Sequence, residues 1–252
     1  IALTPDGTQL AYAANGRVYL RAMSGRDVYP LQGIEGSDGV NAITFAPDSR
    51  AVVFWARDRT LKRISITGGA AISLCEADGP LGLRWDRYGI VFAQQSGIMR
   101  ISPNGGKPEV IVPAKGGEIM LAPQILPGGE AILFTVGDNP TTDGWNRAII
   151  VVQSLRTGER KTLVEGGADG RYVPTGHLVY AVGGTLFAVP FDVRSQEVRG
   201  GPTAIVEGVA RATAAASGGS HFSFADNGSL VYLTAPAGLS SDVFDIAFTD
   251  RD

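Results

Sequence analysis

The stretch IALTPDGTQLAY at residues 1–12 returns as ITFAPDSRAVVF at residues 43–54, and the two Pro-Asp pairs lie 42 residues apart. In each copy, an apolar segment leads into the turn, and a second apolar segment ending in an aromatic residue follows it. Proline presets φ, Asp hydrogen-bonds to the turn backbone, and glycine takes positive φ without strain. Each copy therefore predicts a β-hairpin.

Weaker copies of this hairpin follow along the chain. They lie at residues 83–92, 125–134, 172–180 and 222–232, with the turns DRYG, PGG, PTG and DNG. A third predicted strand comes after each of five hairpins, at residues 17–21, 61–65, 97–101, 148–152 and 185–189. A short fourth strand follows at residues 28–31, 71–74, 109–112, 161–164 and 203–206. The sixth unit supplies only three strands, the last at residues 243–248.

Four strands repeating every roughly 40–50 residues are the signature of a β-propeller. We predict an all-β fold, a propeller of about six four-stranded antiparallel blades, with the last blade incomplete. It forms one domain over residues 1–252, with blades at roughly 1–41, 42–80, 81–121, 122–169, 170–220 and 221–252. An antiparallel sandwich is the rival fold, but it does not explain the fixed period. No convincing helix is expected, because 34 glycines and 14 prolines interrupt any helical pattern.

Composition excludes some partners. The net charge is −3 and no long basic run occurs, so we expect no binding to nucleic acid. No stretch approaches the ~20 apolar residues of a membrane helix, so we expect no direct membrane insertion by this segment. We expect a monomeric domain. Because the chain begins and ends within a repeat, we also expect it to be part of a longer protein.

The Pro-Asp-Gly hairpins with their apolar-aromatic strands resemble the WD40-like (PD40) repeats of TolB-type propellers. Residues 171–180, RYVPTGHLVY, followed by GTLFAVPFD at residues 184–192, resemble the propeller region that follows the kinase domain of bacterial serine/threonine kinases. Similar propellers precede some prolyl-oligopeptidase-type peptidases. The resemblance implies an extracytoplasmic or periplasmic location, although the sequence itself leaves the compartment open. It implies little about function, because one fold hosts many activities.

No catalytic residues are predicted. The chain has two histidines, no Gly-x-Ser-x-Gly elbow, and acidic residues placed mostly in turns. A metal site needs more converging ligands than this, so we expect neither a metal nor another cofactor. Calcium is the alternative, because the spacing of Asp138, Asn139 and Asp143 matches part of a calcium loop, but the distal Glu is missing.

Candidate ligand-binding residues lie where loops are expected at the mouth of the central channel. The loop at residues 137–147 carries a tryptophan with polar neighbours, and an exposed tryptophan would suit a sugar, a peptide or an aromatic ligand. The tryptophan could instead cap the edge of the blade. Other candidates precede predicted innermost strands. The full set is Asn41, Gln124, Asp138, Asp143, Trp145, Arg147, Arg171 and His221.

These features favour a non-catalytic binding or sensor module in a larger bacterial protein, such as a receptor-type serine/threonine kinase. A protein or a small molecule would bind one face of the propeller. One alternative is a propeller enzyme, a hydrolase or lyase, with its site at the channel mouth. The other is a scaffold that positions a neighbouring catalytic domain. Whether the chain is an enzyme stays open, with the balance against catalysis by this chain alone.

Overall fold

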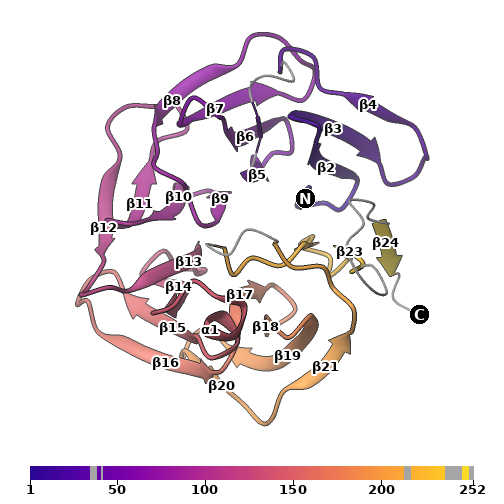
Figure 1. The fold of residues 1–252 in the computed structure, drawn as a ribbon. Coiled ribbons are helices and arrows are strands. Elements are labelled where there is room, and N and C mark those ends of the chain that lie inside the picture. Colours follow the sequence, from indigo (N-terminus) through magenta and orange to yellow (C-terminus); the bar gives the residue numbers. More distant parts are fainter. Residues whose placement is uncertain (35–38, 41, 213–216, 236–245, 250–252) are drawn as a thin grey trace.

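The computed structural model describes residues 1–34, 39–40, 42–212, 217–235 and 246–249. Its strands form antiparallel sheets arranged in a ring around a central axis, with the first strand of each sheet innermost (Figure 1). The first two sheets are β1 (Ala2–Leu3), β2 (Gln9–Ala14), β3 (Arg17–Ala22) and β4 (Val28–Pro30), then β5 (Ala42–Phe45), β6 (Ala51–Trp55), β7 (Thr60–Ser65) and β8 (Ile72–Glu76). The third is β9 (Leu83–Asp86), β10 (Gly89–Gln94), β11 (Gly97–Ile101) and β12 (Glu109–Pro113).

The ring continues through three more sheets. One is β13 (Ile119–Ile125), β14 (Ala131–Gly137), β15 (Ile149–Ser154) and β16 (Arg160–Glu165). The next is β17 (Ala168–Val173), β18 (His177–Val182), β19 (Thr185–Asp192) and β21 (Thr203–Val206), with β20 (Glu197–Val198) also paired to β19. The last is β22 (Phe222–Phe224), β23 (Leu230–Leu233) and β24 (Ile246–Thr249).

The predicted all-β propeller class is confirmed. Within the described residues, five sheets are complete blades, each with at least four strands, and β22–β24 form a three-stranded sheet. The expected number of blades was about six, and the described residues form five complete blades and one three-stranded sheet. The expectation of no helix is wrong at one place. The short helix α1 (Thr142–Asn146) forms inside the long loop, where the Thr141 hydroxyl accepts a hydrogen bond from the backbone N–H of Gly144.

The recurring turn owes its shape to local chemistry. In the first copy, the Asp6 carboxylate accepts hydrogen bonds from the backbone N–H and the hydroxyl of Thr8, and Gly7 has φ 74°. In the second copy, Asp48 accepts from the N–H of Arg50, and Ser49 takes the positive φ in place of glycine. Asp and Asn side chains of this kind replace a backbone partner in a turn. Each hairpin is thus closed before any packing between blades is needed.

Packing between neighbouring sheets forms the core. A buried cluster with Val18, Leu20, Val52 and Phe54 joins the first two sheets, and other clusters join each further pair along the chain. Middle strands such as β10 (Gly89–Gln94) and β14 (Ala131–Gly137) are buried along nearly their whole length. These strands read as continuous apolar runs because both of their faces lie against other sheets.

The ring closes without a covalent link, between β1 and β22. The backbone N–H of Leu3 donates to the Ser223 hydroxyl over 2.9 Å, and the N–H of Asp226 donates to the carbonyl of Pro5 over 2.8 Å. Beneath these bonds, the buried side chains of Leu3 and Leu10 form a cluster that includes Ala225 and Val231. Among the described residues, the two ends of the propeller therefore meet through an apolar interface and through these hydrogen bonds.

Replacing Leu3 with Ala tests this closure. Leu3 is 6% exposed, so Leu3→Ala removes apolar contacts at the closing interface and should lower the free energy of unfolding by about 2–4 kcal/mol in urea denaturation. The matched control is Ile72→Ala on the outer strand β8, where Ile72 is 52% exposed and less than about 1 kcal/mol is expected. Equal losses in the two variants would contradict the closure described here.

Candidate ligand site in the central channel

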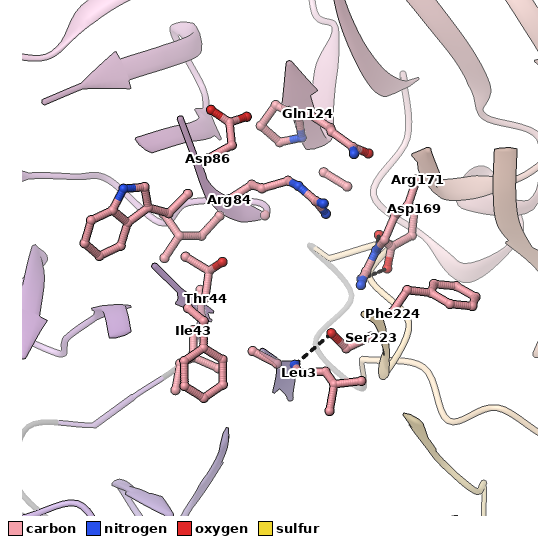
Figure 2. A pocket seen from close by; sticks show the side chains of 18 of the residues that line it. Leu3, Ile43, Thr44, Arg84, Asp86, Gln124, Asp169, Arg171, Ser223 and Phe224 are labelled. Atoms are coloured by element: carbon pink, nitrogen blue, oxygen red, sulfur yellow. Dashed lines mark hydrogen bonds and ion pairs between the residues drawn. The ribbon is translucent and has the colours of Figure 1, made fainter. Parts of the chain in front are cut away.

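A cavity of about 540 Å³ occupies the centre of the ring. Every innermost strand that the structure describes contributes to its wall, and Figure 2 shows how side chains from these strands face the same space. One residue from each such strand is Leu3 of β1, Thr44 of β5, Arg84 of β9, Gln124 of β13, Arg171 of β17 and Ser223 of β22. A volume of this size is within the range of small-molecule sites, roughly 300–1,000 Å³.

Arg84 is the functional group that stands out in this wall. It belongs to β9, and its side chain reaches into the open centre of the cavity (Figure 2). Its guanidinium makes no hydrogen bond and no ion pair with any residue that the structure describes. Burial and the positive charge of Arg171 both lower the pKa of Arg84, but an arginine stays protonated in proteins. A charged group therefore lies in the cavity without a hydrogen bond or ion pair from the described wall, although the charges of Asp86 and Asp226 attract it from a distance.

Asp86 lies two residues further along β9, so its side chain is on the same face of the strand. One carboxylate oxygen accepts a hydrogen bond of 2.7 Å from the backbone N–H of Tyr88, within the tight turn that leads to Gly89. The other oxygen is buried and has no hydrogen-bond partner in the part of the chain that the structure describes. Burial raises the pKa of Asp86, while Arg84 lowers it at a distance. The negative charge of Asp86 thus only partly offsets the positive charge of Arg84.

Arg171 is fully engaged, in contrast to Arg84. Its guanidinium donates to both carboxylate oxygens of Asp169, over 2.9 and 2.8 Å, and to the carbonyl of Phe222 over 2.6 Å. It also lies 3.9 Å above the centre of the Phe222 ring. Asp169 is 1% exposed and accepts a further hydrogen bond from the N–H of Ser220. This network joins β17 to β22 and gives each of the three guanidinium nitrogens of Arg171 a hydrogen-bond acceptor.

Two irregular innermost strands make these placements possible. The register shifts in β13 between Leu121 and Gln124, and in β17 between Ala168 and Arg171. Ala122 and Asp169, which lie inside these bulges, have φ of 52° and 55°. Bulges re-aim side chains, and non-glycine residues with positive φ are costly and often occur at functional sites. The bulge in β17 is what places Asp169 beside Arg171.

Gln124 lines the cavity but holds the wall together. Its side-chain amide donates to the carbonyl of Tyr172 and accepts from the N–H of the same residue, over 3.0 and 2.9 Å. The Gln124 side chain therefore links β13 to the innermost strand of the next blade, in the way that a neighbouring backbone would. The two amide atoms used in these bonds are not left for a ligand.

His221 precedes β22 and also lines the cavity. Burial lowers its pKa from 6.5 to about 4, and the positive charge of Arg171 acts in the same direction. The imidazole is therefore neutral at neutral pH. A neutral histidine of this kind is able to accept a proton or a hydrogen bond.

The sequence-predicted residues of the long loop are not among the residues that line this cavity. Asp138, Asp143 and Arg147 are exposed and are not part of its wall. Asn41 lies outside the described residues. Of the eight candidates, the wall includes Gln124, Arg171 and His221. Ligand binding by any of the eight stays a prediction.

Of the two interpretations of the tryptophan in the long loop, an exposed ligand contact or a residue that caps the blade edge, the structure agrees with the buried one. Trp145 is 1% exposed and packs in a buried cluster with Leu121, Ala148 and Ala168. Its ring also lies directly against Gly218, where a Cβ atom would clash. Thr141 caps the N-terminus of helix α1, and the buried side of this helix carries Trp145. Trp145 therefore packs the loop onto the blade.

Arg84 was not among the predicted residues, although the repeat holds a signal for it. At the equivalent position, the other units carry Ala2, Thr44, Gln124, Arg171 and Ser223. Two of the six units thus carry an arginine where the other four carry small or uncharged polar side chains, which indicates a local role for both arginines. In the sequence analysis, residues 83–86 were assigned only to a strand of the third hairpin.

Among the described residues, no group of three or more His, Cys, Asp or Glu side chains is placed to hold a metal ion. In that same set of residues, no helix has the length and apolar character needed to cross a bilayer.

Comparisons with known proteins identify the fold. No protein-family model matches the chain, and no curated protein sequence matches it. Among solved structures, a manganese complex of an oligogalacturonate lyase is similar with a TM-score of 0.61 and 12% identity, over 94% of this chain and 73% of that one. The oligogalacturonate lyase of Vibrio parahaemolyticus gives 0.59 and 10% identity, over 97% and 74% of the two chains.

TolB from Acinetobacter baumannii is also similar, with a TM-score of 0.58 and 18% identity, over 79% of this chain and 55% of that one. Likenesses at this level of identity establish the fold alone. They fit the expected TolB-type propeller, whereas none of these neighbours is a kinase propeller. What the neighbours bind or cleave is a property of those proteins.

The role of Asp169 is testable by removing its charge. Asn accepts the same positive φ as Asp, so Asp169→Asn keeps the backbone and leaves Arg171 uncompensated. The free energy of unfolding should fall by about 2–4 kcal/mol, measured by urea denaturation. Asp78→Asn, which breaks the exposed pair with Arg59, is the control and should cost less than about 1 kcal/mol. A small loss in Asp169→Asn would show that the network does not join the sheets.

His221 predicts a pH dependence of stability. Because its folded pKa is near 4 and its unfolded pKa is near 6.5, the unfolded chain binds the proton first as pH falls. Between pH 6.5 and 4, the wild-type protein should lose about 2–3 kcal/mol that His221→Gln does not lose. The measurement is the free energy of unfolding of both proteins at pH 7, 5.5 and 4.5. A difference between them that stays constant with pH would contradict the lowered pKa.

Proposed function

We propose that this chain is a non-catalytic, ligand-binding propeller module, and that the central cavity is its ligand site. The observation that carries the proposal is Arg84, a charged side chain that reaches into a cavity of about 540 Å³ without a partner among the described residues. Charged groups that are partly withdrawn from water are normally paired, so a half-buried arginine without a hydrogen bond or ion pair at a cavity supports a ligand of opposite charge there.

The state of the remaining polar groups supports binding over catalysis. Asp169 and Arg171 are bound to each other and to the neighbouring sheet, and Gln124 is bound to the backbone of Tyr172. These groups stiffen the wall and are not free to exchange protons with a substrate. A rigid wall with one open anchor suits recognition, because a preorganised site loses less entropy on binding.

The proposed place of the module is within a larger bacterial protein. The likeness of residues 171–192 to the propellers that follow kinase domains supports a sensor role in a receptor-type kinase, outside the cytoplasm. In that setting, ligand binding in the channel would be transmitted to a neighbouring domain. A ligand changes such an equilibrium only by the difference in its affinity for the two states.

A propeller enzyme is the second candidate, and a specific observation favours it. His221 and Asp86 both line the cavity, and burial lowers the pKa of His221 and raises that of Asp86. Perturbed groups of this kind in one cavity are typical of acid–base chemistry. In that case, neutral His221 would be the proton acceptor. Two of the similar structures are lyases, which is consistent with this candidate.

Blocking the cavity separates a channel site from any other site. Thr44 lines the cavity on β5, so Thr44→Tyr fills part of it with a side chain that strands tolerate. Neutral and acidic oligosaccharides, lactones and short peptides would be screened by their effect on the melting temperature. A ligand that stabilises the wild type should not stabilise Thr44→Tyr, and should still stabilise Thr162→Tyr, whose site on β16 is exposed.

The same incubations, followed by NMR, decide between binding and turnover. Unchanged ligand after long incubation supports the binding module. Consumption of a ligand by the wild type, abolished in His221→Gln, would overturn the non-catalytic proposal in favour of the enzyme. Stabilisation that is equal in wild type and Thr44→Tyr would place the site outside the channel and overturn the cavity proposal.

A further inference from the structure

Arg84 and its surroundings indicate which ligand chemistry the cavity accepts. Resting on the proposed binding function, we propose that the channel takes an organic monocarboxylate, and that the carboxylate pairs with the guanidinium of Arg84 while the body of the ligand lies on the apolar wall. Neither the predicted site residues nor the comparisons identify this position.

The first step is the energetic state of Arg84. A guanidinium presents five N–H donors in a fixed fork and does not lose its proton in proteins. None of these donors has a hydrogen-bond partner among the described residues, and the residue is partly buried at the channel wall. Each unused donor in such a position forfeits a hydrogen bond. A planar oxyanion that accepts two parallel bonds is the partner with matching geometry.

The second step is the contrast with Arg171. Both arginines face the same cavity, but Asp169 already supplies Arg171 with a bidentate carboxylate. The chain thus contains, a short way around the ring, the type of pair that Arg84 lacks. The positive charge of Arg171 adds to the potential at Arg84, which makes an anion between the two strands more favourable.

The third step is the charge of the whole wall, which selects a single negative charge. Its charged residues are Arg84, Arg87 and Arg171, and Asp86, Asp169 and Asp226. Three cations and three anions balance, and His221 is neutral at pH 7. A phosphate dianion or a polyanion would meet the three Asp carboxylates without a surplus of cations. One carboxylate matches the one unpaired guanidinium.

The fourth step is the apolar part of the wall. Leu3, Ile43 and Phe224 line the cavity together with Arg84, and Figure 2 shows them on the other side of the open space from Asp86 and Gln124. A ligand with an apolar or aromatic body would bury part of its surface there while its carboxylate reaches Arg84. The wall is therefore amphipathic, as such a ligand requires.

The test uses carboxylates and their neutral amides as matched probes. Benzoate, phenylacetate and N-acetylglycine would be titrated into the ¹⁵N-labelled chain, in parallel with benzamide, phenylacetamide and N-acetylglycinamide, and with inorganic phosphate. At least one carboxylate should bind saturably, at least about tenfold more tightly than its amide and more tightly than phosphate. A neutral amide that binds as well as its carboxylate, or phosphate that binds better, would overturn the inference.

Variants assign the binding to Arg84. Arg84→Gln should lower the affinity for the carboxylate at least about tenfold. Arg84→Lys keeps the positive charge but loses the forked geometry of the guanidinium, so its carboxylate affinity should lie between those of the wild type and Arg84→Gln. Arg156→Gln, at an exposed turn between β15 and β16, should bind like the wild type. Unchanged affinity in Arg84→Gln would overturn the inference, and if that variant does not fold, unchanged affinity in Arg84→Lys would overturn it.

The results also separate this inference from the proposed function. If no carboxylate binds, but a neutral ligand does and Thr44→Tyr abolishes its binding, then the carboxylate inference fails and the binding module stands. If a carboxylate binds equally to wild type and Thr44→Tyr, the channel site itself fails. Carboxylate binding that depends on both Arg84 and Thr44 supports the two together.

Discussion

The non-covalent closure between β1 and β22 is the constraint on which the rest of the molecule depends. Each blade packs only on its neighbours, so a repeat protein of this kind has two ends that would otherwise expose apolar faces. Leu3 and Leu10 bury one of those faces against Ala225 and Val231. Closure makes the wall of the channel continuous, and the cavity exists only because the wall is continuous. The network of Asp169 and Arg171 also needs it, since Arg171 donates to the Phe222 carbonyl at the start of β22.

Within this ring, polar groups at the axis have two different tasks. Gln124, Asp169 and Arg171 are saturated by the protein and fix the positions of the innermost strands. Arg84 is not saturated, although it occupies the same channel. The first group makes the wall rigid, and the rigid wall holds the unpaired cation in place. A ligand that completes Arg84 would therefore meet a site that needs little rearrangement, which is how preorganisation contributes to affinity.

Local chemistry is the part of this molecule that could be predicted from the sequence. The Asp6 and Asp48 turns, the glycine positions and the apolar strands depend on neighbours within a few residues, and they led to the propeller class. Long-range contacts were beyond such reasoning. The burial of Trp145 depends on Gly218, far along the chain, and the task of Gln124 depends on the backbone of Tyr172 in the next blade. The isolation of Arg84 is likewise a property of the assembled ring, because any of several acidic residues could have paired with it.

The central claim is that the channel holds a ligand through Arg84. A crystal structure of the chain soaked with the tightest-binding carboxylate tests it most directly. The account predicts density for the ligand in the central cavity, with both carboxylate oxygens about 3 Å from guanidinium nitrogens of Arg84. Density at another site, or an Arg84 side chain turned to bond Asp86 while the channel stays empty of ligand, would contradict it.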